Sequence, residues 1–439
     1  MDYFDSLSDL LKIEWEEDKR QYVEQTEKTS AATRREMGLC WYPIAIRGTE
    51  MGRGEYLIVE AERTTHHELN HQFRFGMPAA IFSNHDPQTD RVEGVVSHIS
   101  GNRIKITLRT DELPEWSRTG KLGIDLLFDD NSYDEMKNAL KKAKAVQKEN
   151  ASKIISLLSG HGNPTFKDRN SFYKNPLLND SQNEAVEKIL NANELAIVHG
   201  PPGTGKTTTI VQAIMALLKH DCKRILVCAP SNTAVDLLSE KLSVEGVNVI
   251  RVGNPVRVGE RLQSITLDSK VSAHEMMKEA KKLKKQAQEY KNMAHKYKRN
   301  FGREERDQRK LLFDEALKIM REVENTEKYI MEDLFGKAQV IAATLVGANH
   351  FTVSGLKYDA LIIDEAGQAL EPACWIPLLK SEKVILAGDH CQLPPTIKSE
   401  VAAKNGLNKT LLEKCVSRYP ESVSLLKEQY RMNHKIMSY

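Results

Sequence analysis

The stretch Gly200-Pro-Pro-Gly-Thr-Gly-Lys-Thr-Thr-Thr209 decides the fold of the middle of this chain. It follows the apolar run Leu195-Ala-Ile-Val-His199 and precedes Ile210–Leu218, in which apolar residues recur at helical spacing. A glycine-rich turn between a buried strand and a helix is the setting of a phosphate-binding loop, because backbone N–H groups and the positive helix end converge on phosphate oxygens. The segment predicts a nucleoside triphosphate site, and both flanks disfavour the alternative of a chance match.

Each residue type in this loop has its own expected task. The glycines let the backbone turn its N–H groups inward, Lys206 reaches the β- and γ-phosphates, and the Thr207 hydroxyl ligates Mg²⁺. The loop positions expected to contact the nucleotide are Gly200, Pro201, Pro202, Gly203, Thr204, Gly205, Lys206, Thr207 and Thr208.

Composition sets broad limits on the rest. The 439 residues are enough for roughly three domains. No apolar run approaches the roughly 20 residues that cross a bilayer, and the start shows no signal-peptide pattern. The six cysteines form no C-x-x-C pair, so neither a disulfide framework nor a zinc site is indicated and a cytoplasmic location is expected. The net charge of +2 names no partner.

The N-terminal part predicts a small barrel carried on helices. Residues 1–37 form the first expected helix, with Phe4, Leu7, Leu11 and Trp15 on one face. In residues 38–130, short β-rich runs alternate with Gly, Asn and Asp turns, as in a barrel. Residues 131–160 predict a second helix whose packing stripe is Met136, Leu140 and Val146. Two helices flanking a barrel suggest a stalk.

Strand and helix patterns alternate through residues 161–271 and 335–423, which predicts α/β architecture with a parallel sheet covered by helices. Residues 272–334 interrupt it as a charged helical insertion, with Gly302 as the candidate turn of a hairpin. From Lys278 to Lys310 there are 13 Lys/Arg against 5 Asp/Glu. This surplus fits either a solvated helix pair or a nucleic-acid contact.

Further candidates follow other apolar runs. Asp364 and Glu365 end the run Ala360–Ile363, where Asp364 is expected to hold Mg²⁺ through water and Glu365 to polarise the attacking water. The alternative is a charge pair at a helix N-terminus. Gln392 is placed to sense a γ-phosphate, and Gln182 to read an adenine edge. The segment Ser231-Asn232-Thr233 offers donors suited to a phosphate backbone.

The order of these motifs resembles that of superfamily 1 helicases, most closely the immunoglobulin-mu-binding-protein type, which is related to the nonsense-mediated-decay helicase. The resemblance covers essentially the whole chain, since that family also has stalk helices, a barrel and a helical insertion. It implies a RecA-like P-loop NTPase fold and ATP-driven 5′→3′ movement on single-stranded RNA or DNA. The motifs are Gln182, 200–209, Ser231–Thr233, Asp364-Glu365, Gly388-Asp-x-x-Gln-Leu-Pro-Pro395 and Gln429-Tyr430-Arg431.

The resemblance also implies residue roles, with ATP and Mg²⁺ as cofactors and a monomer without membrane contact. Gln182 and Tyr430 would contact adenine, and Gln392 and Arg431 the γ-phosphate. Lys206, Thr207, Asp364 and Glu365 keep the roles given above. The implied nucleic-acid contacts are Ser231, Asn232, Thr233 and Thr344.

Residues 424–439 match only the start of the family's second RecA-like domain. We therefore expect an incomplete motor that binds ATP but turns it over poorly, because losing an arginine finger costs about 10³–10⁵ in rate. Ring-forming AAA ATPases share the loop sequence, but the 158 positions between Lys206 and Asp364 disfavour them. An ATP-gated nucleic-acid clamp without unwinding activity, and the choice between RNA and DNA, stay open.

Overall fold

A computed structural model of the chain describes residues 2–430, apart from 27, 52–55, 75, 88, 109, 111, 119, 169–172, 221, 254–259 and 296–301. The described residues belong to two compact units. The first unit takes its residues from 1–164, 365–379 and 388–421, and the second from 165–364, 380–387 and 422–439. The domain bounds inferred from the sequence stay a prediction.

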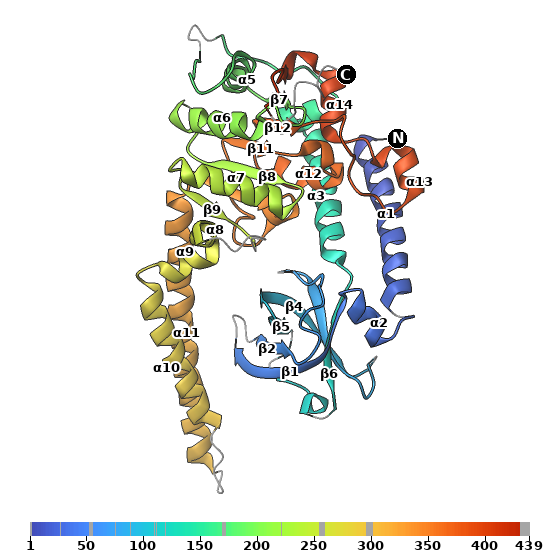
Figure 1. Ribbon diagram of the computed structural model, residues 1–439. Helices are drawn as coiled ribbons and strands as arrows, with labels where there is room; N and C mark the ends of the chain where they lie inside the picture. Colours follow the sequence, from blue (N-terminus) through green and yellow to red (C-terminus); the bar gives the residue numbers. More distant parts are fainter. Residues whose placement is uncertain are drawn as a thin grey trace. The chain divides into compact units, whose positions relative to one another are not determined.

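The first unit contains a closed antiparallel barrel of six strands in the order β1-β2-β5-β4-β3-β6 (Figure 1). Alternate side chains along the strands fill its interior, among them Trp41, Val59 and Ile106, which are almost fully buried. The helix α2 (Ala31–Glu36) and the 3₁₀ turn η2 (Glu115–Arg118) accompany it. The strands are β1 (Cys40–Met51), β2 (Leu57–Arg63), β3 (Pro78–Ser83), β4 (Arg91–Ser100), β5 (Arg103–Leu108) and β6 (Leu122–Leu126).

The second stalk helix is broken in two. Helix α3 (Asp130–Lys148) ends before Asn150, whose φ of +48° is a left-handed conformation that asparagine tolerates better than most residues. Helix α4 (Lys153–Leu158) then starts afresh with Ser152 as its N-cap. The continuous helix expected over this region is therefore wrong. Met136 and Leu140 are buried as expected, but Val146 is only half-buried, and Ala143 completes the stripe instead.

The N-terminal helix α1 (Tyr3–Thr26) packs through Phe4, Leu7 and Leu11, which are all buried, as the helical spacing predicts. Trp15 is only half-buried, and its Nε1 donates to Asp130 Oδ1 at 2.6 Å. Further helices of this unit are α12 (Glu371–Leu378), α13 (Glu400–Ala402), the π-helical turn η5 (Ala403–Leu407) and α14 (Leu411–Arg418).

The buried carboxylate of Glu14 connects α1 to the segment just before α13. The two oxygens of Glu14 accept the backbone N–H groups of Lys398 and Ser399 at 2.7 and 2.8 Å. Each oxygen thus has a donor, which offsets the cost of burying the charge.

Replacing Glu14 by alanine removes the acceptor of both N–H groups, of which that of Ser399 is buried. We expect Glu14→Ala to lower the free energy of unfolding by about 2–3 kcal/mol. Urea unfolding of the whole protein measures it. The control is Glu16→Ala on the same helix, where the side chain is 57% exposed and the change should be small. Equal unfolding midpoints for the two variants would contradict the role of Glu14.

The second unit is built on a sheet of seven strands in the order β13-β7-β12-β11-β8-β10-β9. The pairs β9–β10, β10–β8, β8–β11, β11–β12 and β7–β13 are parallel. Its central strands are continuous apolar runs, as parallel strands buried on both faces require. The strands are β7 (Leu195–His199), β8 (Ile225–Ala229), β9 (Val249–Arg251), β10 (Val340–Thr344), β11 (Ala360–Ile363), β12 (Val384–Gly388) and β13 (Val423–Leu425).

The register brings the carboxyl ends of these strands to one edge. Leu425 pairs with His199, Thr344 with Ala229, and Ile363 with Cys228. The connecting helices are α5 (Asp180–Asn191), α6 (Lys206–His220), α7 (Asn232–Val244), α8 (Glu260–Ile265) and α9 (Leu267–Ala273). The parallel α/β sheet and the separate barrel confirm the predicted fold class.

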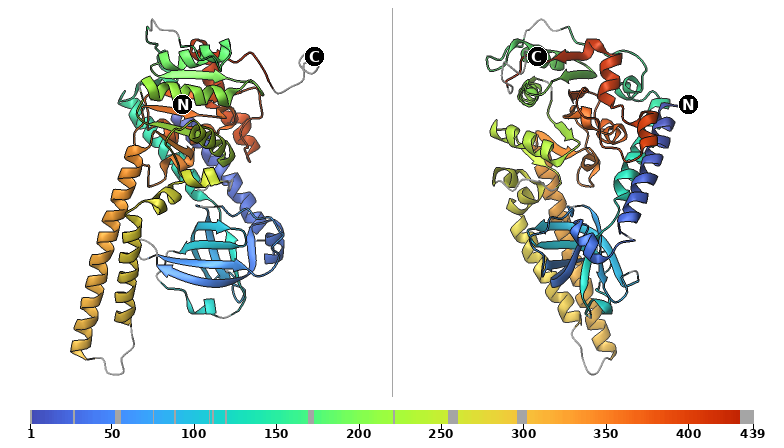
Figure 2. Two further views of the ribbon diagram at one scale, coloured as in Figure 1. Left: turned by 60° about the vertical axis from the view of Figure 1, so that its left-hand side comes forward. Right: turned by 45° about the vertical axis from the view of Figure 1, so that its right-hand side comes forward.

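The charged insertion forms two long helices, α10 (Met277–His295) and α11 (Arg303–Lys337), which lie side by side in both views of Figure 2. Ala280 of α10 packs with Ile330 of α11. Gly302 is the N-cap residue of α11, while the residues just before it lie outside the described part of the chain. None of the helices among the described residues combines the length and apolar character that a bilayer span needs.

Candidate functional site

Residues 200–205 connect β7 to α6 as a tight loop. Gly203 and Gly205 have φ of +82° and +77°, which glycine adopts at no steric cost. A Cβ on Gly205 would lie 2.5 Å from Gln182 Nε2, so any other residue there would displace the Gln182 amide as well as strain the backbone. Thr204 is buried and its hydroxyl donates to Pro201 O at 2.7 Å. The loop therefore has the wrapped backbone of a phosphate cradle ahead of a helix N-terminus.

Lys206 and Asp364 meet at the end of this loop. Lys206 Nζ lies 3.8 Å from Asp364 Oδ1, and the two side chains are 10% and 5% exposed. Lys206 begins α6, whereas Asp364 follows β11, two strands from β7 in the sheet. The Asp364 N–H donates to Cys228 O of the neighbouring strand β8, which fixes the backbone there. The structure thus brings together the two residues on which the sequence interpretation rests.

The threonines after Lys206 differ in exposure. Thr207 is half-buried and Thr208 is exposed, both in the first turn of α6. Thr209 is buried and donates its hydroxyl to Gly205 O at 3.1 Å, which ties the helix back to the loop. In the loop itself, Pro202 is exposed. Thr207 is the hydroxyl beside Lys206 that remains a candidate Mg²⁺ ligand.

Gln182 lies against the loop, but its amide already has structural partners. Gln182 and Asn179 form a capping box at the start of α5, in which each side-chain oxygen accepts the backbone N–H of the other residue. Gln182 Nε2 also donates to Thr204 O at 3.1 Å. The spacing Asn179-x-x-Gln182 was the signal for this box. Gln182 thus orders the loop, and its contact with adenine stays a prediction.

Tyr430 reaches the same loop from the other end of the chain. Its N–H donates to Gly203 O at 2.8 Å, and its hydroxyl accepts from Asn179 Nδ2 at 2.7 Å. The residue is nevertheless 64% exposed, and an exposed aromatic ring is a surface on which a planar ligand can stack. Arg431, the predicted γ-phosphate contact, lies outside the described residues.

Glu365 has an unusual backbone. Its φ and ψ are +52° and +36°, a left-handed conformation that costs a non-glycine residue about 1–3 kcal/mol. It stands between β11 and a 3₁₀ turn of three residues, η4 (Ala366–Gln368). Asp364 and Glu365 therefore lie on a sharp turn after a strand, which disagrees with a charge pair in the first turn of an α-helix. Such strain collects at functional sites.

The turn after Glu365 packs closely on the loop after β12. A Cβ on Gly367 would lie 2.3 Å from Asp389 O, and one on Gly388 would lie 2.9 Å from Gly367 N. In that loop, Asp389 accepts from Cys391 N at 2.9 Å and from Gln392 Nε2 at 3.1 Å. Asp389 thus orients Gln392. Motif spacing alone did not predict this contact, although an Asp followed by a turn is typical of such side-chain caps.

The four predicted nucleic-acid contacts lie at the ends of adjacent strands. Ser231 caps α7, since its Oγ accepts from Ala234 N at 3.2 Å, and Thr233 is exposed in the next turn. Thr344 ends β10, and its Oγ1 accepts from Gly347 N at 3.1 Å. Because β8 and β10 are neighbours in register, these residues share one part of the sheet edge.

Asn232 belongs to a buried charge network that sequence spacing did not reveal. Arg251, at the end of β9, is fully buried and donates through Nε to Asp236 Oδ1 at 2.8 Å. Its NH2 donates to Asn232 Oδ1 at 2.7 Å. Burial lowers the pKa of the Arg251 guanidinium, and the hydrogen bond to Asp236 acts in the opposite direction.

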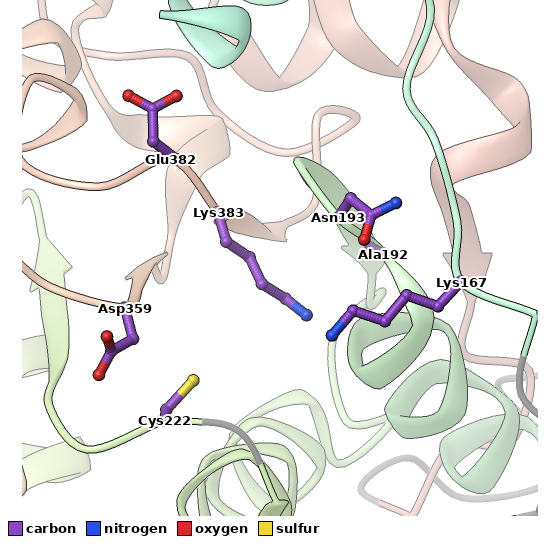
Figure 3. Close-up of a pocket in the computed structure, with 7 residues that line it drawn as sticks. All are labelled: Lys167, Ala192, Asn193, Cys222, Asp359, Glu382 and Lys383. Carbon is purple, nitrogen blue, oxygen red and sulfur yellow. The ribbon is translucent and has the colours of Figure 1, made fainter.

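A small cavity of about 250 Å³ lies elsewhere in this unit, where strands β7, β8, β11 and β12 begin (Figure 3). The amino groups of Lys167 and Lys383 point toward each other there. Lys383 Nζ donates to Leu190 O near the C-terminus of α5, and Asp359 accepts the N–H groups of Lys223 and Arg224. These contacts are those of helix and strand ends, and the cavity lies at the sheet edge away from the phosphate loop.

The fold and this loop define a P-loop NTPase. Residues 177–400 match the AAA domain family, and the chain belongs to it. The chain is 32% identical to an uncharacterised ATP-dependent helicase of Methanocaldococcus jannaschii (82% of this chain, 58% of that protein). It is 37% identical to DNA-binding protein SMUBP-2 of Rattus norvegicus (71% and 31%) and 30% identical to a regulator of nonsense transcripts 1 homologue of Arabidopsis thaliana (79% and 27%).

These likenesses confirm the resemblance drawn from the motif order: the chain is a superfamily 1 helicase sequence of the DNA2/NAM7 type. It spans between 27% and 58% of the length of these three relatives. The activity, the substrate and the partners of this protein are therefore given below as proposals.

The contact between the two loops yields a stability prediction. We expect Gly367→Ala to lower the free energy of unfolding by about 1–3 kcal/mol, because the added methyl group must displace backbone atoms of Asp389. Gly355→Ala is the control, since a Cβ there meets nothing within 4 Å. Thermal unfolding of both variants measures the difference. If Gly367→Ala unfolds at the wild-type temperature, the two loops do not constrain each other.

Proposed function

We propose that this protein is an ATP-dependent helicase that hydrolyses ATP and moves 5′→3′ along single-stranded RNA or DNA. The observation that carries the proposal is the approach of Lys206 to Asp364 beside the glycine-rich loop. The name of the Methanocaldococcus jannaschii relative, an uncharacterised ATP-dependent helicase, supports the class of activity. Polarity and strand preference rest on the family resemblance.

The residues beside the loop fit magnesium and a nucleoside triphosphate. A hydroxyl and a carboxylate are the oxygen ligands that Mg²⁺ takes when it also keeps water and phosphate ligands. Thr207 supplies the hydroxyl and Asp364 the carboxylate, while Lys206 is the cation for the β- and γ-phosphates. Bound with ATP, Mg²⁺ would neutralise part of the phosphate charge.

Hydrolysis is assigned to the strained turn. Glu365 would orient the attacking water, and Gln392, held by Asp389, would face the γ-phosphate together with Arg431. On the base side, the exposed residue Tyr430 is suited to stacking on adenine, and Gln182, which is bonded to the loop through Thr204 O, would contact the base as well. The roles of these five residues are proposals, and that of Arg431 rests on the resemblance alone.

The location proposed for the protein is the cytoplasm, where it would work as a monomer. The six cysteines, all within the described residues, form no disulfide, which suits a reducing compartment.

The nucleic-acid track is proposed to run from the strand ends at Ser231 and Thr344 to the basic helix α10. Of the four lysines that make α10 most basic, Lys281, Lys282 and Lys285 are exposed. Lys284 is different, since its Nζ lies 2.8 Å from Oε1 of the buried Glu327 on α11. It joins the two helices, so its charge belongs to the hairpin interface.

The proposed function is tested with ATP hydrolysis and strand displacement together. Purified protein is assayed for ATP turnover with and without single-stranded RNA or DNA, and for displacement on a duplex with a 5′ tail. Stimulated turnover with displacement supports the helicase. Stimulated binding without displacement supports the clamp, and turnover that ignores nucleic acid contradicts both.

Two variants separate nucleotide binding from hydrolysis. We expect Lys206→Ala to abolish ATP binding, because the buried cation that meets the phosphates is lost. Glu365→Gln should retain binding and lower turnover by about 10²–10⁴-fold, as loss of a positioned general base does. Fluorescent nucleotide titration and phosphate release measure the two effects. Undiminished turnover in Glu365→Gln would remove Glu365 from catalysis.

Charge removal on α10 tests the basic surface. We expect the triple change of Lys281, Lys282 and Lys285 to glutamine to weaken nucleic-acid binding and to reduce the slope of log affinity against log salt by up to about 3, roughly one for each phosphate that a lysine no longer neutralises. Lys284→Gln is the matched control on the same helix and should lower thermal stability more than the salt slope. An unchanged salt slope in the triple variant would show that these three lysines are only solvated and do not contact nucleic acid.

A further inference from the structure

Arg251 is an expensive residue to bury, and the fold gives it a specific use. Its side chain is 0% exposed at the end of the edge strand β9. Arginine is almost never fully buried unless it is paired, because taking a charge out of water costs several kcal/mol. Here the two side-chain partners, Asp236 and Asn232, lie on one helix, α7, and the third nitrogen of the guanidinium donates to the carbonyl of Val252. Arg251 therefore fixes the first turn of α7 against the sheet.

The chemistry of the contact settles which way the Asn232 amide faces. Arginine carries only donors, so the atom of Asn232 at 2.7 Å from its NH2 must be the oxygen. The oxygen end is thus directed at a buried guanidinium. The nitrogen end, with two N–H donors, is the end that is not engaged by the guanidinium on this half-buried residue. An asparagine free to rotate would present either end.

We propose that Arg251 is a positioning residue, which orients Asn232 so that its amide nitrogen donates to a phosphate oxygen of the nucleic-acid backbone. The inference rests on the proposed function, because it assigns the phosphodiester as the ligand at the strand ends of β8 and β10. Asp236 balances the arginine charge, so the donor offered to the phosphate is a neutral amide. A neutral donor on the backbone carries no base preference.

Two substitutions of Asn232 separate a donor from a structural link. Asn232→Asp retains an oxygen for Arg251, and an acidic residue in the first helical turn is favourable for the fold. Yet it replaces the N–H donor with a negative oxygen. We expect Asn232→Ala to weaken binding of a fluorescent single-stranded oligonucleotide about 3- to 10-fold, the worth of one hydrogen bond, and Asn232→Asp to weaken it further.

The opposite order of the two oligonucleotide affinities, with Asn232→Asp binding more tightly than Asn232→Ala, contradicts the proposal. If Asn232 only links α7 to β9, Asn232→Asp binds the oligonucleotide like the wild type, because it keeps the contact with Arg251. That result overturns the inference. Thermal unfolding of Asn232→Asp, expected at or above the wild-type temperature, shows that the folded protein was measured. Wild-type protein that binds no oligonucleotide with ATP present refutes the proposed function itself, before any variant is compared.

The role of Arg251 is tested through Asn232. Arg251→Lys keeps a positive charge that can pair with Asp236. It lacks the planar guanidinium, so it cannot bond Asp236 and Asn232 at the same time in a fixed geometry. We expect the oligonucleotide concentration that half-stimulates ATP turnover to rise about 3- to 10-fold, with kcat at saturating oligonucleotide unchanged. In the Asn232→Ala background the same change should have no further effect. An equal loss in both backgrounds would show that Arg251 does not act through Asn232.

Discussion

The approach of Lys206 to Asp364 depends on the parallel order of the sheet. Parallel strands end at one edge, so residues far apart in sequence converge there without any local signal joining them. The charged insertion does not disturb this, since it leaves after β9 and returns at β10, and these strands are paired from Val340 with Val249 onward. Asn248 connects the two ends of the insertion, because its side chain accepts from Lys270 and donates to the carbonyl of Lys337. The insertion lengthens the chain between the two motifs without moving either strand.

The sequence predicted what local spacing encodes. The loop at 200–209 and the strand before Asp364 were placed correctly, because an apolar strand followed by its turn residues is a local pattern. The sequence did not predict ion pairs between distant residues, namely that of Arg251 with Asp236 and that of Lys284 with Glu327. Only the fold supplies the second partner of such a pair. Lys284 was counted as part of a basic surface for that reason.

Several of these missed contacts are buried charges, and each joins separate elements of its unit. Glu14 connects α1 to the turn before α13, Arg251 connects β9 to α7, and Glu327 connects α11 to α10. An apolar contact of equal area would stabilise the fold about as much as a buried ion pair, since desolvation offsets most of the attraction within such a pair. A buried charge with geometrically defined partners also disfavours slipped arrangements, as a mispaired buried charge is costly. Register and helix orientation are what these pairs determine.

The same cost shapes the nucleotide site. Lys206 and Asp364 are both mostly buried, and each lowers the cost of burying the other. In the proposed function, a triphosphate with Mg²⁺ replaces this pairing by two new ones, lysine with phosphate and aspartate with the metal. After the exchange the lysine is paired with phosphate and the aspartate with the metal, so entry of the ligand leaves neither of these two buried side chains unpaired. An isolated lysine would attract phosphate more strongly but would have to be buried alone. The aspartate across the loop lets the cation be buried before the nucleotide arrives.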